Sequence, residues 1–480
     1  MKRTTIDPVK KKKLVLVGNG PAGFKFCEKF VKYRLGKQFD LVVYGEEIHP
    51  AYDRIHLTDF FAGGSAEKLY LATPAWYAQH KITLKTGQRV VAINRSEKLL
   101  TSSTGVTEQY DTLVLATGAV PFVPAWADTS QPGVFIYRTL EDLKAIQAYL
   151  QKGRRAAVLG GGILGLEAAR ALLQEGLHTS IVETAPHLMP RQLDAEGATL
   201  LRRQLEALGL DIHCGKHAQH ISGKGIDCTD GTLIPADLVI ISAGITPRDE
   251  LARACGLNIG AAGGIVVNNH NLTSDEHIFA IGECALSDGK IWGLAAPCFE
   301  MAEVVAARLA KIYKVFGGHL PLTKLKVIEV NVASFGDAAG LQPHTPLVSS
   351  GPGTYKRINI SPDGQYVLGG IFVGDTTGST RLFHMQRNRV KITGDPAALI
   401  APGADAAETI ASLPGDTVIC LCEGLCKDAI VADIRGNNLT RLDEVRKTTG
   451  AGTGCESCTS LLEDLLNEMQ KIIQNENPTR

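Results

Sequence analysis

The chain has 480 residues, a length that predicts about three domains, and its 50 lysines and arginines balance its 50 aspartates and glutamates. A formal net charge of zero gives no global attraction to nucleic acid or to an anionic membrane, and we expect neither as a partner. No stretch approaches the roughly 18 apolar residues of a membrane span and the N-terminus lacks the apolar core of a signal peptide, so we expect a cytoplasmic protein.

The first predicted element is a strand, a glycine turn and a helix over residues 11–30. The glycines of the turn have the GxGxxG spacing of a dinucleotide site and are Gly18, Gly20 and Gly23. In such a turn the first glycine permits a tight bend, the second lets backbone approach a pyrophosphate, and the third lets helix pack on strand. A second strand over Asp40–Tyr44 leads to Glu46, whose carboxylate suits the two hydroxyls of an adenosine ribose. A plain glycine turn is the alternative.

The same order of elements recurs further along the chain. A strand over Arg155–Leu159 leads into a helix, and a later strand ends at Glu183. The glycines of this second turn are Gly160, Gly162 and Gly165. Both modules also close alike, because residues 110–121 and 236–247 are apolar strands that run into a glycine and then a proline. This internal repeat supports two nucleotide-binding folds over two unrelated buried strands.

A third element follows in residues 271–285. A strand over Ile278–Ile281 delivers Gly282 and Glu283 to a loop, and a helix follows with Pro297 in its first turn. The amide end of that helix can stabilise negative charge on a reduced ring system.

These residues resemble the two-dinucleotide-binding-domain flavoprotein reductases, from Lys12 to the 390s. The resemblance implies an α/β protein with two Rossmann-like dinucleotide-binding domains, an α+β interface domain and, here, a small helical iron-sulfur domain. It implies that the first module binds FAD through Gly18, Gly20, Pro21, Ala22, Gly23, Glu46, Arg54, Thr117, Gly118, Gly282, Glu283 and Pro297. It implies that the second binds the nicotinamide nucleotide through Gly160, Gly162, Ile163, Leu164, Gly165, Glu167, Glu183 and Gly244. Glu283 departs from the usual aspartate.

We expect the following domain boundaries. They are an FAD-binding domain of residues 12–122 and 246–316, an NAD-binding domain of residues 123–245, an interface domain of residues 317–393, a linker of residues 394–416 and an iron-sulfur domain of residues 417–475. In the interface domain, Leu325–Ser334 and Tyr366–Phe372 are strand-like.

Two features of these modules bear on their chemistry. A carboxylate at Glu183 accepts ribose hydroxyls and repels a 2′-phosphate, which predicts NADH over NADPH. Neither CxxC nor CxxxxC occurs in residues 12–320, so we do not expect disulfide reduction. We expect no general acid or nucleophile to be essential.

Residues 45–64 resemble the corresponding segment of the NADH-dependent assimilatory nitrite reductase large subunits. This resemblance implies that Arg54 lies over the flavin phosphates or the ring edge. The alternative is a surface ion pair of Arg54 with Asp53 or Asp59.

A cysteine quartet closes the chain. Its members form a CxC and a CxxC and are Cys420, Cys422, Cys455 and Cys458. Four thiolates in two close pairs ligate either zinc or a [2Fe-2S] cluster. We expect helices over residues 427–435, 442–449 with a cap at Thr440, and 459–473. Amides of the glycine-rich loop 449–454 favour iron, because donors near sulfur make a cluster easier to reduce.

The quartet and its loop resemble the bacterioferritin-associated ferredoxin-like domain over residues 418–473, with Cys426 a bystander. Electrons would then pass from NADH to FAD, to the cluster, and to a partner. The sirohaem cysteines of the nitrite reductases are not in this sequence, so we expect the partner to be the catalytic subunit of an assimilatory nitrate or nitrite reductase. The alternatives are a free-standing rubredoxin or ferredoxin reductase and a redox-sensing binding flavoprotein.

Overall fold

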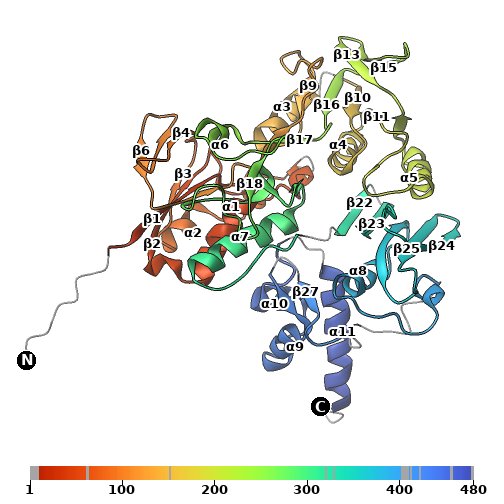
Figure 1. The fold of residues 1–480 in the computed structure, drawn as a ribbon. Helices are drawn as coiled ribbons and strands as arrows, with labels where there is room; N and C mark the ends of the chain where they lie inside the picture. The colour runs from red at the N-terminus through yellow and green to blue at the C-terminus, as the bar shows by residue number, and fades with distance from the viewer. Residues whose placement is uncertain are drawn as a thin grey trace, which may run out of the picture. The chain divides into compact units, whose positions relative to one another are not determined.

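The computed structural model describes residues 10–60, 64–150, 153–318, 322–327, 330–401, 410, 413–420, 423–454 and 458–476. The chain divides into two compact units, one of residues 1–120 and 245–319 and one of residues 121–244 and 320–480 (Figure 1). Each unit contains a parallel sheet flanked by helices, which confirms the predicted α/β class.

The first unit is built on a parallel five-stranded sheet of order β19-β7-β1-β2-β3. Its strands are β1 (Lys12–Val17), β2 (Phe39–Tyr44), β3 (Thr83–Lys85), β7 (Thr112–Leu115) and β19 (Ile278–Ala280). The smaller sheets use β4 (Val90–Asn94), β5 (Leu99–Ser102), β6 (Thr107–Gln109), β8 (Ala119–Pro121), β17 (Ile245–Pro247), β18 (Ile265–Val267), β20 (Ala285–Ser287) and β21 (Lys290–Ile291). The helices are α1 (Pro21–Lys32), α2 (Pro74–Gln79), α6 (Glu250–Ala254) and α7 (Ala295–Leu309).

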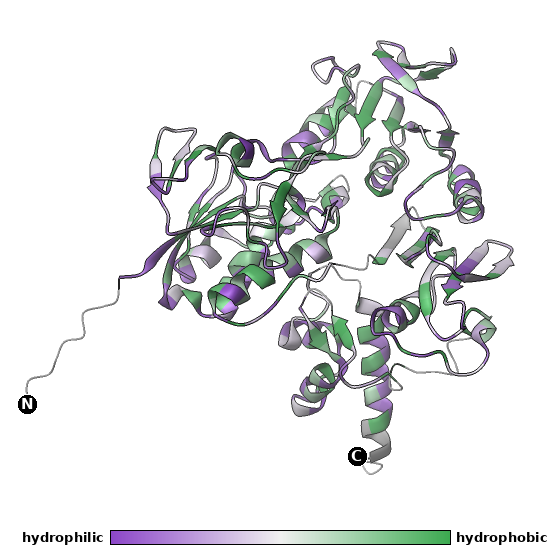
Figure 2. Ribbon diagram, in the orientation of Figure 1, coloured by the Kyte–Doolittle hydropathy of each residue, from purple (hydrophilic) through white to green (hydrophobic). Residues whose placement is uncertain are grey.

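Helices α1 and α7 pack against each other in this unit, although they come from opposite ends of its sequence. Phe26 and Phe30 of α1 join Met301 and Val305 of α7 in one buried cluster with strand β1. Figure 2 shows α7 and the sheet strands largely in the apolar colour. Burying a side chain of this size stabilises the fold by about 1.5–3 kcal/mol, so this cluster joins the two segments of the unit.

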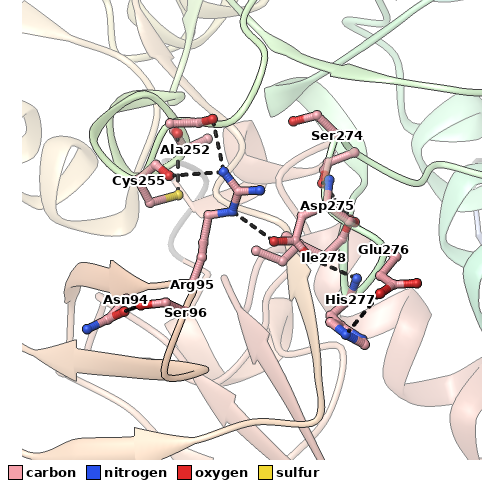
Figure 3. Close-up of polar contacts among 12 residues, drawn as sticks. Asn94, Arg95, Ser96, Ala252, Cys255, Ser274, Asp275, Glu276, His277 and Ile278 are labelled. Atoms are coloured by element: carbon pink, nitrogen blue, oxygen red, sulfur yellow. Dashed lines mark hydrogen bonds and ion pairs between the residues drawn. The ribbon is translucent and has the colours of Figure 1, made fainter.

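Polar contacts join the same two segments at another point. Arg95, in the turn after β4, donates from Nε to the Asp275 carboxylate at 2.8 Å and from Nη1 to the Gly256 carbonyl at 3.0 Å (Figure 3). The guanidinium thereby holds the end of α6 and the loop before β19 against the β4–β5 hairpin.

The second unit begins with another parallel five-stranded sheet, of order β12-β11-β10-β16-β9. Its strands are β9 (Val134–Ile136), β10 (Arg155–Leu159), β11 (His178–Glu183), β12 (Asp211–Cys214) and β16 (Leu238–Ile241). A small antiparallel sheet uses β13 (Ala218–Ser222), β14 (Gly225–Cys228) and β15 (Leu233–Pro235). The helices are α3 (Leu140–Leu150), α4 (Ile163–Gln174) and α5 (Ala195–Ala207).

An antiparallel five-stranded sheet of order β22-β23-β26-β25-β24 follows. Its elements are β22 (Leu322–Val327), β23 (Val330–Gly336), β24 (Thr345–Gly351), β25 (Thr354–Ile360), β26 (Val367–Val373) and α8 (Ser379–Arg387). The strand-like run expected over residues 325–334 is divided between β22 and β23, which pair antiparallel. The alternating pattern of side chains by itself does not show where one strand ends and the next begins.

The two faces of this antiparallel sheet contact different helices. Side chains alternate along β25, so Tyr355 and Arg357 point one way and reach Asp194, the N-cap of α5, at 2.6 and 2.9 Å. Ile358 points the other way and lies in a buried cluster with Phe383 of α8. The sheet is therefore held between α5 and α8.

The C-terminal segment forms β27 (Val418–Cys420), β28 (Leu425–Cys426), α9 (Lys427–Gly436), α10 (Leu442–Thr449) and α11 (Thr459–Glu476). The three expected helices are confirmed, but the expected cap at Thr440 is wrong by one residue. Arg441 is the N-cap of α10, and the Glu444 carboxylate accepts hydrogen bonds from the N–H groups of Thr440 and Arg441. Within the described residues, the helices lack either the length or the apolar character that crossing a bilayer requires.

Candidate functional site

The first glycine turn lies at the carboxyl edge of the first parallel sheet. Gly18 has a φ of +113°, and a Cβ there would lie 2.0 Å from the Ala116 carbonyl oxygen. A Cβ at Gly23 would lie 2.2 Å from the Gly18 carbonyl oxygen. Both positions therefore exclude any side chain, as the predicted tight turn and close packing require.

Gly20 differs from its neighbours because a Cβ there would meet nothing within 4 Å. It is the N-cap of α1 and supplies no side-chain cap, with Pro21 as the first helical residue. The first amides of a helix have no partners within that helix, and an uncapped end faced by open space suits an anion such as a pyrophosphate.

The second glycine turn repeats this geometry. Gly160 has a φ of +120° and its Cβ would lie 2.2 Å from the Ser242 carbonyl oxygen, while a Cβ at Gly165 would lie 2.0 Å from the Gly160 carbonyl oxygen. Gly162 again faces open space and is the uncapped N-cap of α4, which begins with Ile163 and Leu164. The second unit thus presents a second anion-binding helix start.

Other predicted residues follow neighbouring strands of the first sheet. Thr117 and Gly118 follow β7, and Gly282 and Glu283 follow β19. Ligands of open parallel sheets bind at the carboxyl ends of the strands, where these residues gather. A Cβ at Gly282 would lie 3.1 Å from the Cβ of Ala22, so this loop directly adjoins the first glycine turn. Glu283 is half-buried.

The start of α7 resembles that of α1. Its N-cap, Leu294, supplies no side-chain hydrogen bond, and Pro297 is buried in the first turn, as expected. The helix therefore has free amide capacity at its N-terminus.

Glu46 follows β2 at the same sheet edge and has a partner that sequence reasoning missed. Arg248 Nη1 lies 2.6 Å from Glu46 Oε2, and Arg89 Nη1 lies 3.8 Å from Oε1. The backbone of Arg248 also donates to the Gly118 carbonyl at 2.9 Å and accepts from the Thr117 hydroxyl at 2.6 Å. The only signal in the sequence was its place directly after the closing motif that ends at Pro247.

Arg54 pairs with neither of the aspartates considered for it. Its Nη2 donates to Glu47 Oε1 at 2.5 Å, and its guanidinium lies 5.2 Å from the centre of the Tyr52 ring. Asp53 instead bonds His56 at 2.7 Å. Tyr52 donates to the other oxygen of Glu47 at 2.6 Å, so Glu47 orients both side chains.

Glu183, at the end of β11, is hydrogen-bonded to the second glycine turn. Its carboxylate accepts from the Gly161 N–H at 2.6 Å and from the Ala185 N–H at 2.7 Å. Glu167 is half-buried on α4, and Gly244, with a φ of +120°, faces open space. The Glu183 carboxylate is thus held beside the turn that would take a nucleotide.

Cys27 and Cys284 of the first unit are buried thiols. Burial, followed by the nearby Glu28 carboxylate, strongly raises the pKa of Cys27. Burial also raises the pKa of Cys284, whose Sγ lies 3.3 Å from the Ile281 carbonyl oxygen. A thiol must ionise to attack, so neither side chain is prepared for thiolate chemistry.

The structure describes two of the four predicted cluster ligands. Cys420 ends β27 and Cys458 precedes α11, and both are almost completely buried. Cys422 and Cys455 lie outside the described residues. Cys426 is the N-cap of α9 and is half-buried. Gly450 and Gly452 have positive φ values of +79° and +74°, so the loop before Cys455 bends sharply.

The segment with the cysteines packs on α8 of the preceding sheet domain. The Thr380 and Ser460 hydroxyls lie 3.4 Å apart, joining α8 to α11. Val418 of β27 packs against the apolar cluster that contains Phe383. The strand that carries Cys420 is therefore anchored within the second unit.

Comparison with known proteins places these features in context. A family model described as pyridine nucleotide-disulphide oxidoreductase matches residues 12–307, and one described as BFD-like [2Fe-2S] binding domain matches residues 418–468. These matches imply FAD, NAD(P)H and a [2Fe-2S] cluster, which agrees with two open glycine turns and a terminal cysteine quartet.

Two related proteins align with most of the chain. It is 41% identical over 464 residues to the NAD(P)H nitrite reductase large subunit of Klebsiella oxytoca, covering 94% of this chain and 48% of that protein. It is 34% identical over 469 residues to the assimilatory nitrate reductase electron transfer subunit of Bacillus subtilis (strain 168), covering 96% and 60%. The chain thus spans about half the length of the first relative and three fifths of the second.

A solved structure matches the larger part of the fold. The ferredoxin reductase for the CYP199A2 system from Rhodopseudomonas palustris superposes with a TM-score of 0.74 at 26% identity, covering 82% of this chain and 98% of that one.

Proposed function

We propose that this chain, which belongs to the pyridine nucleotide-disulphide oxidoreductase family, takes electrons from NADH onto FAD and passes them through a [2Fe-2S] cluster to a nitrate- or nitrite-reducing centre. The observation that carries the proposal is the union, in one chain, of two open glycine turns with a terminal cysteine quartet. The nitrite and nitrate reductase relatives support the class of acceptor.

The residues of the first unit have separate tasks in this proposal. The open turn at Gly20 and the start of α1 would hold the FAD pyrophosphate, and Glu46 would hold its adenosine ribose. The loops at Thr117 and Gly282 would border the rest of the cofactor. When bound, FAD supplies the conversion of a two-electron hydride into single electrons.

The residues of the second unit would hold the donor. Gly162 and the start of α4 would take the NADH pyrophosphate, and Glu183 the adenosine ribose. A fixed carboxylate at this position repels a 2′-phosphate, which favours NADH over NADPH. Glu167 would orient the nicotinamide amide.

Electrons leave the flavin through the C-terminal cysteines in this proposal. A CxxC or CxxxxC pair is lacking from residues 12–320, and burial raises the pKa of the Cys27 thiol. The Cys420–Cys422 and Cys455–Cys458 pairs are the thiolate donors that a [2Fe-2S] cluster needs.

Anaerobic titration with NADH, followed by optical absorbance and low-temperature EPR, tests the proposal. We expect flavin absorbance to bleach while the rhombic EPR signal of a reduced [2Fe-2S] cluster grows. Flavin bleaching without that signal would contradict the electron path, and zinc in place of iron in metal analysis would replace the cluster with a structural site.

A second candidate is a reductase of a small carrier such as rubredoxin or ferredoxin. The match to a ferredoxin reductase over 82% of the chain favours it. Stopped-flow rates separate the two candidates. Fast reduction of carriers, together with no transfer to a co-purifying molybdenum or sirohaem protein, would favour the carrier reductase.

A further inference from the structure

We propose that Arg248 is a positioning residue for the adenosine ribose of FAD, acting through the Glu46 carboxylate. The inference rests on the proposed function, because it takes Glu46 as the acid that receives the ribose hydroxyls. Arg248 lies just after β17, where the chain returns to the first unit.

The side chain of Arg248 holds one oxygen of Glu46 and leaves the other available. Nη1 lies 2.6 Å from Oε2, whereas Arg89 approaches Oε1 only to 3.8 Å, which is longer than a hydrogen bond. A carboxylate oxygen has two acceptor sites, so both oxygens retain capacity for ribose hydroxyls. The guanidinium therefore orients the carboxylate and leaves acceptor sites for the ribose hydroxyls.

The guanidinium is mostly buried and has a second carboxylate at ion-pair distance. Its Nε lies 3.6 Å from Glu250 Oε1, and the Arg248 side chain is 23% exposed against 43% for Glu46. Burial by itself lowers the pKa of Arg248, but Glu46 and then Glu250 outweigh it and raise the pKa, so the charge is permanent. A half-exposed carboxylate would otherwise sample several rotamers, and fixing one in advance removes an entropy cost from binding.

The backbone of Arg248 also holds the turn that contains two further predicted FAD contacts. Its N–H donates to the Gly118 carbonyl and its carbonyl accepts from the Thr117 hydroxyl, at 2.9 and 2.6 Å. One residue thus ties the end of β2 to the turn after β7. These strands are not adjacent, because β1 lies between them.

The test compares FAD with an analogue that lacks the 2′-hydroxyl of the adenosine ribose. Apoprotein is titrated with each, using the quenching of flavin fluorescence, and FMN serves as a ligand without the adenosine half. In the wild type we expect FAD to bind about tenfold more tightly than the analogue, the effect of one hydrogen bond to a charged group. In Arg248→Met we expect FAD affinity to fall about tenfold, the preference over the analogue to disappear, and FMN affinity to stay the same.

Further variants separate positioning from damage to the fold. Arg253→Met is the matched control, because Arg253 is 62% exposed and pairs with Asp249 at 3.3 Å instead of Glu46. It should leave both affinities unchanged. Arg248→Lys keeps the charge and should retain part of the preference for FAD. In a Glu46→Gln background, Arg248→Met should cause no further loss.

The possible outcomes are distinct. FAD affinity equal to that of the wild type in Arg248→Met would overturn the role of Arg248. Equal losses of FAD and FMN affinity would also overturn it, because they would mark general damage. A wild-type apoprotein that takes up no FAD would overturn the proposed function itself.

Discussion

Lys29 on α1 and Glu303 on α7 form a buried ion pair, with Nζ 3.4 Å from Oε2 and side chains only 2% and 6% exposed. Tyr33 donates to the other carboxylate oxygen at 2.9 Å, and Lys314 lies 3.1 Å from Oε2. The pair joins the N-terminal segment of the first unit to the segment that returns at residue 245.

Removing the carboxylate should destabilise this unit strongly. Glu303→Leu removes the carboxylate that faces the buried Lys29 ammonium, and breaking a buried pair in this way costs about 3–5 kcal/mol. Urea unfolding followed by circular dichroism measures the change. The double variant Lys29→Met/Glu303→Leu should recover most of the stability, because Lys314 can turn into solvent. A double variant as unstable as the single one would contradict this account.

The same carboxylate predicts a loss of stability in acid. Burial by itself raises the pKa of Glu303, but the charges of Lys29 and Lys314 and the hydrogen bonds outweigh it, so its folded pKa is below the ordinary value. Its contribution is therefore fully present above the unfolded pKa and is lost as pH falls through the folded pKa. Unfolding midpoints measured from neutral pH downwards should fall less steeply in Lys29→Met/Glu303→Leu than in the wild type.

The two kinds of glycine in the second turn should respond differently to alanine. Gly162→Ala adds a Cβ in open space, so the fold should survive while the KM for NADH rises about tenfold, because the Cβ occupies the approach of the pyrophosphate. Gly160→Ala places a Cβ 2.2 Å from the Ser242 carbonyl oxygen and should lower the thermal midpoint. Dye-reduction kinetics and thermal denaturation distinguish them. An unchanged KM in Gly162→Ala would place the pyrophosphate elsewhere.

Neutralising Glu183 should weaken the choice of nucleotide. Glu183→Gln removes the charge that repels a 2′-phosphate, so the ratio of kcat/KM for NADH to that for NADPH should fall about tenfold. Glu175→Gln, at the exposed C-cap of the same α4, is the control and should leave the ratio unchanged. A wild type that already prefers NADPH tenfold or more would refute the assignment of Glu183.

Cys420 of β27 and Cys426 of the paired β28 offer a matched test of the cluster. Cys420→Ser should remove iron and abolish transfer to the protein acceptor, while NADH-dependent dye reduction by the flavin stays nearly intact. Cys426→Ser alters the half-buried N-cap of α9 and should keep both the EPR signal and transfer. Equal loss of dye reduction and transfer in Cys420→Ser would contradict a path that leaves the flavin through the cluster.

Some local features were predictable from short stretches of sequence. The α10 helix begins and ends where expected, at Leu442–Thr449. The spacing of its apolar residues and the glycine that ends it are both visible within a few residues of sequence. The cap was misplaced by one residue because the acid that completes the capping box, Glu444, stands three residues after Arg441 and four after Thr440. The boundary between β22 and β23 was missed because residues 325–334 contain neither the glycine nor the proline that commonly marks the end of a strand.

The two glycine turns, and the acids that follow their neighbouring strands, could be located from the amino-acid order alone. Positive φ angles, and the clash of a Cβ at Gly23 or Gly165 with the first glycine of its own turn, act within one turn of chain, so spacing alone records them. Which side chains pair depends on how the chain folds in three dimensions. Arg248 reaches Glu46 and Thr117, the latter 131 residues away, and Arg54 pairs with Glu47 instead of an aspartate. The Arg248 contacts depend on which strand ends meet at one sheet edge, and no spacing in a linear chain specifies that meeting. The Arg54–Glu47 pair depends on the conformation of the segment after β2.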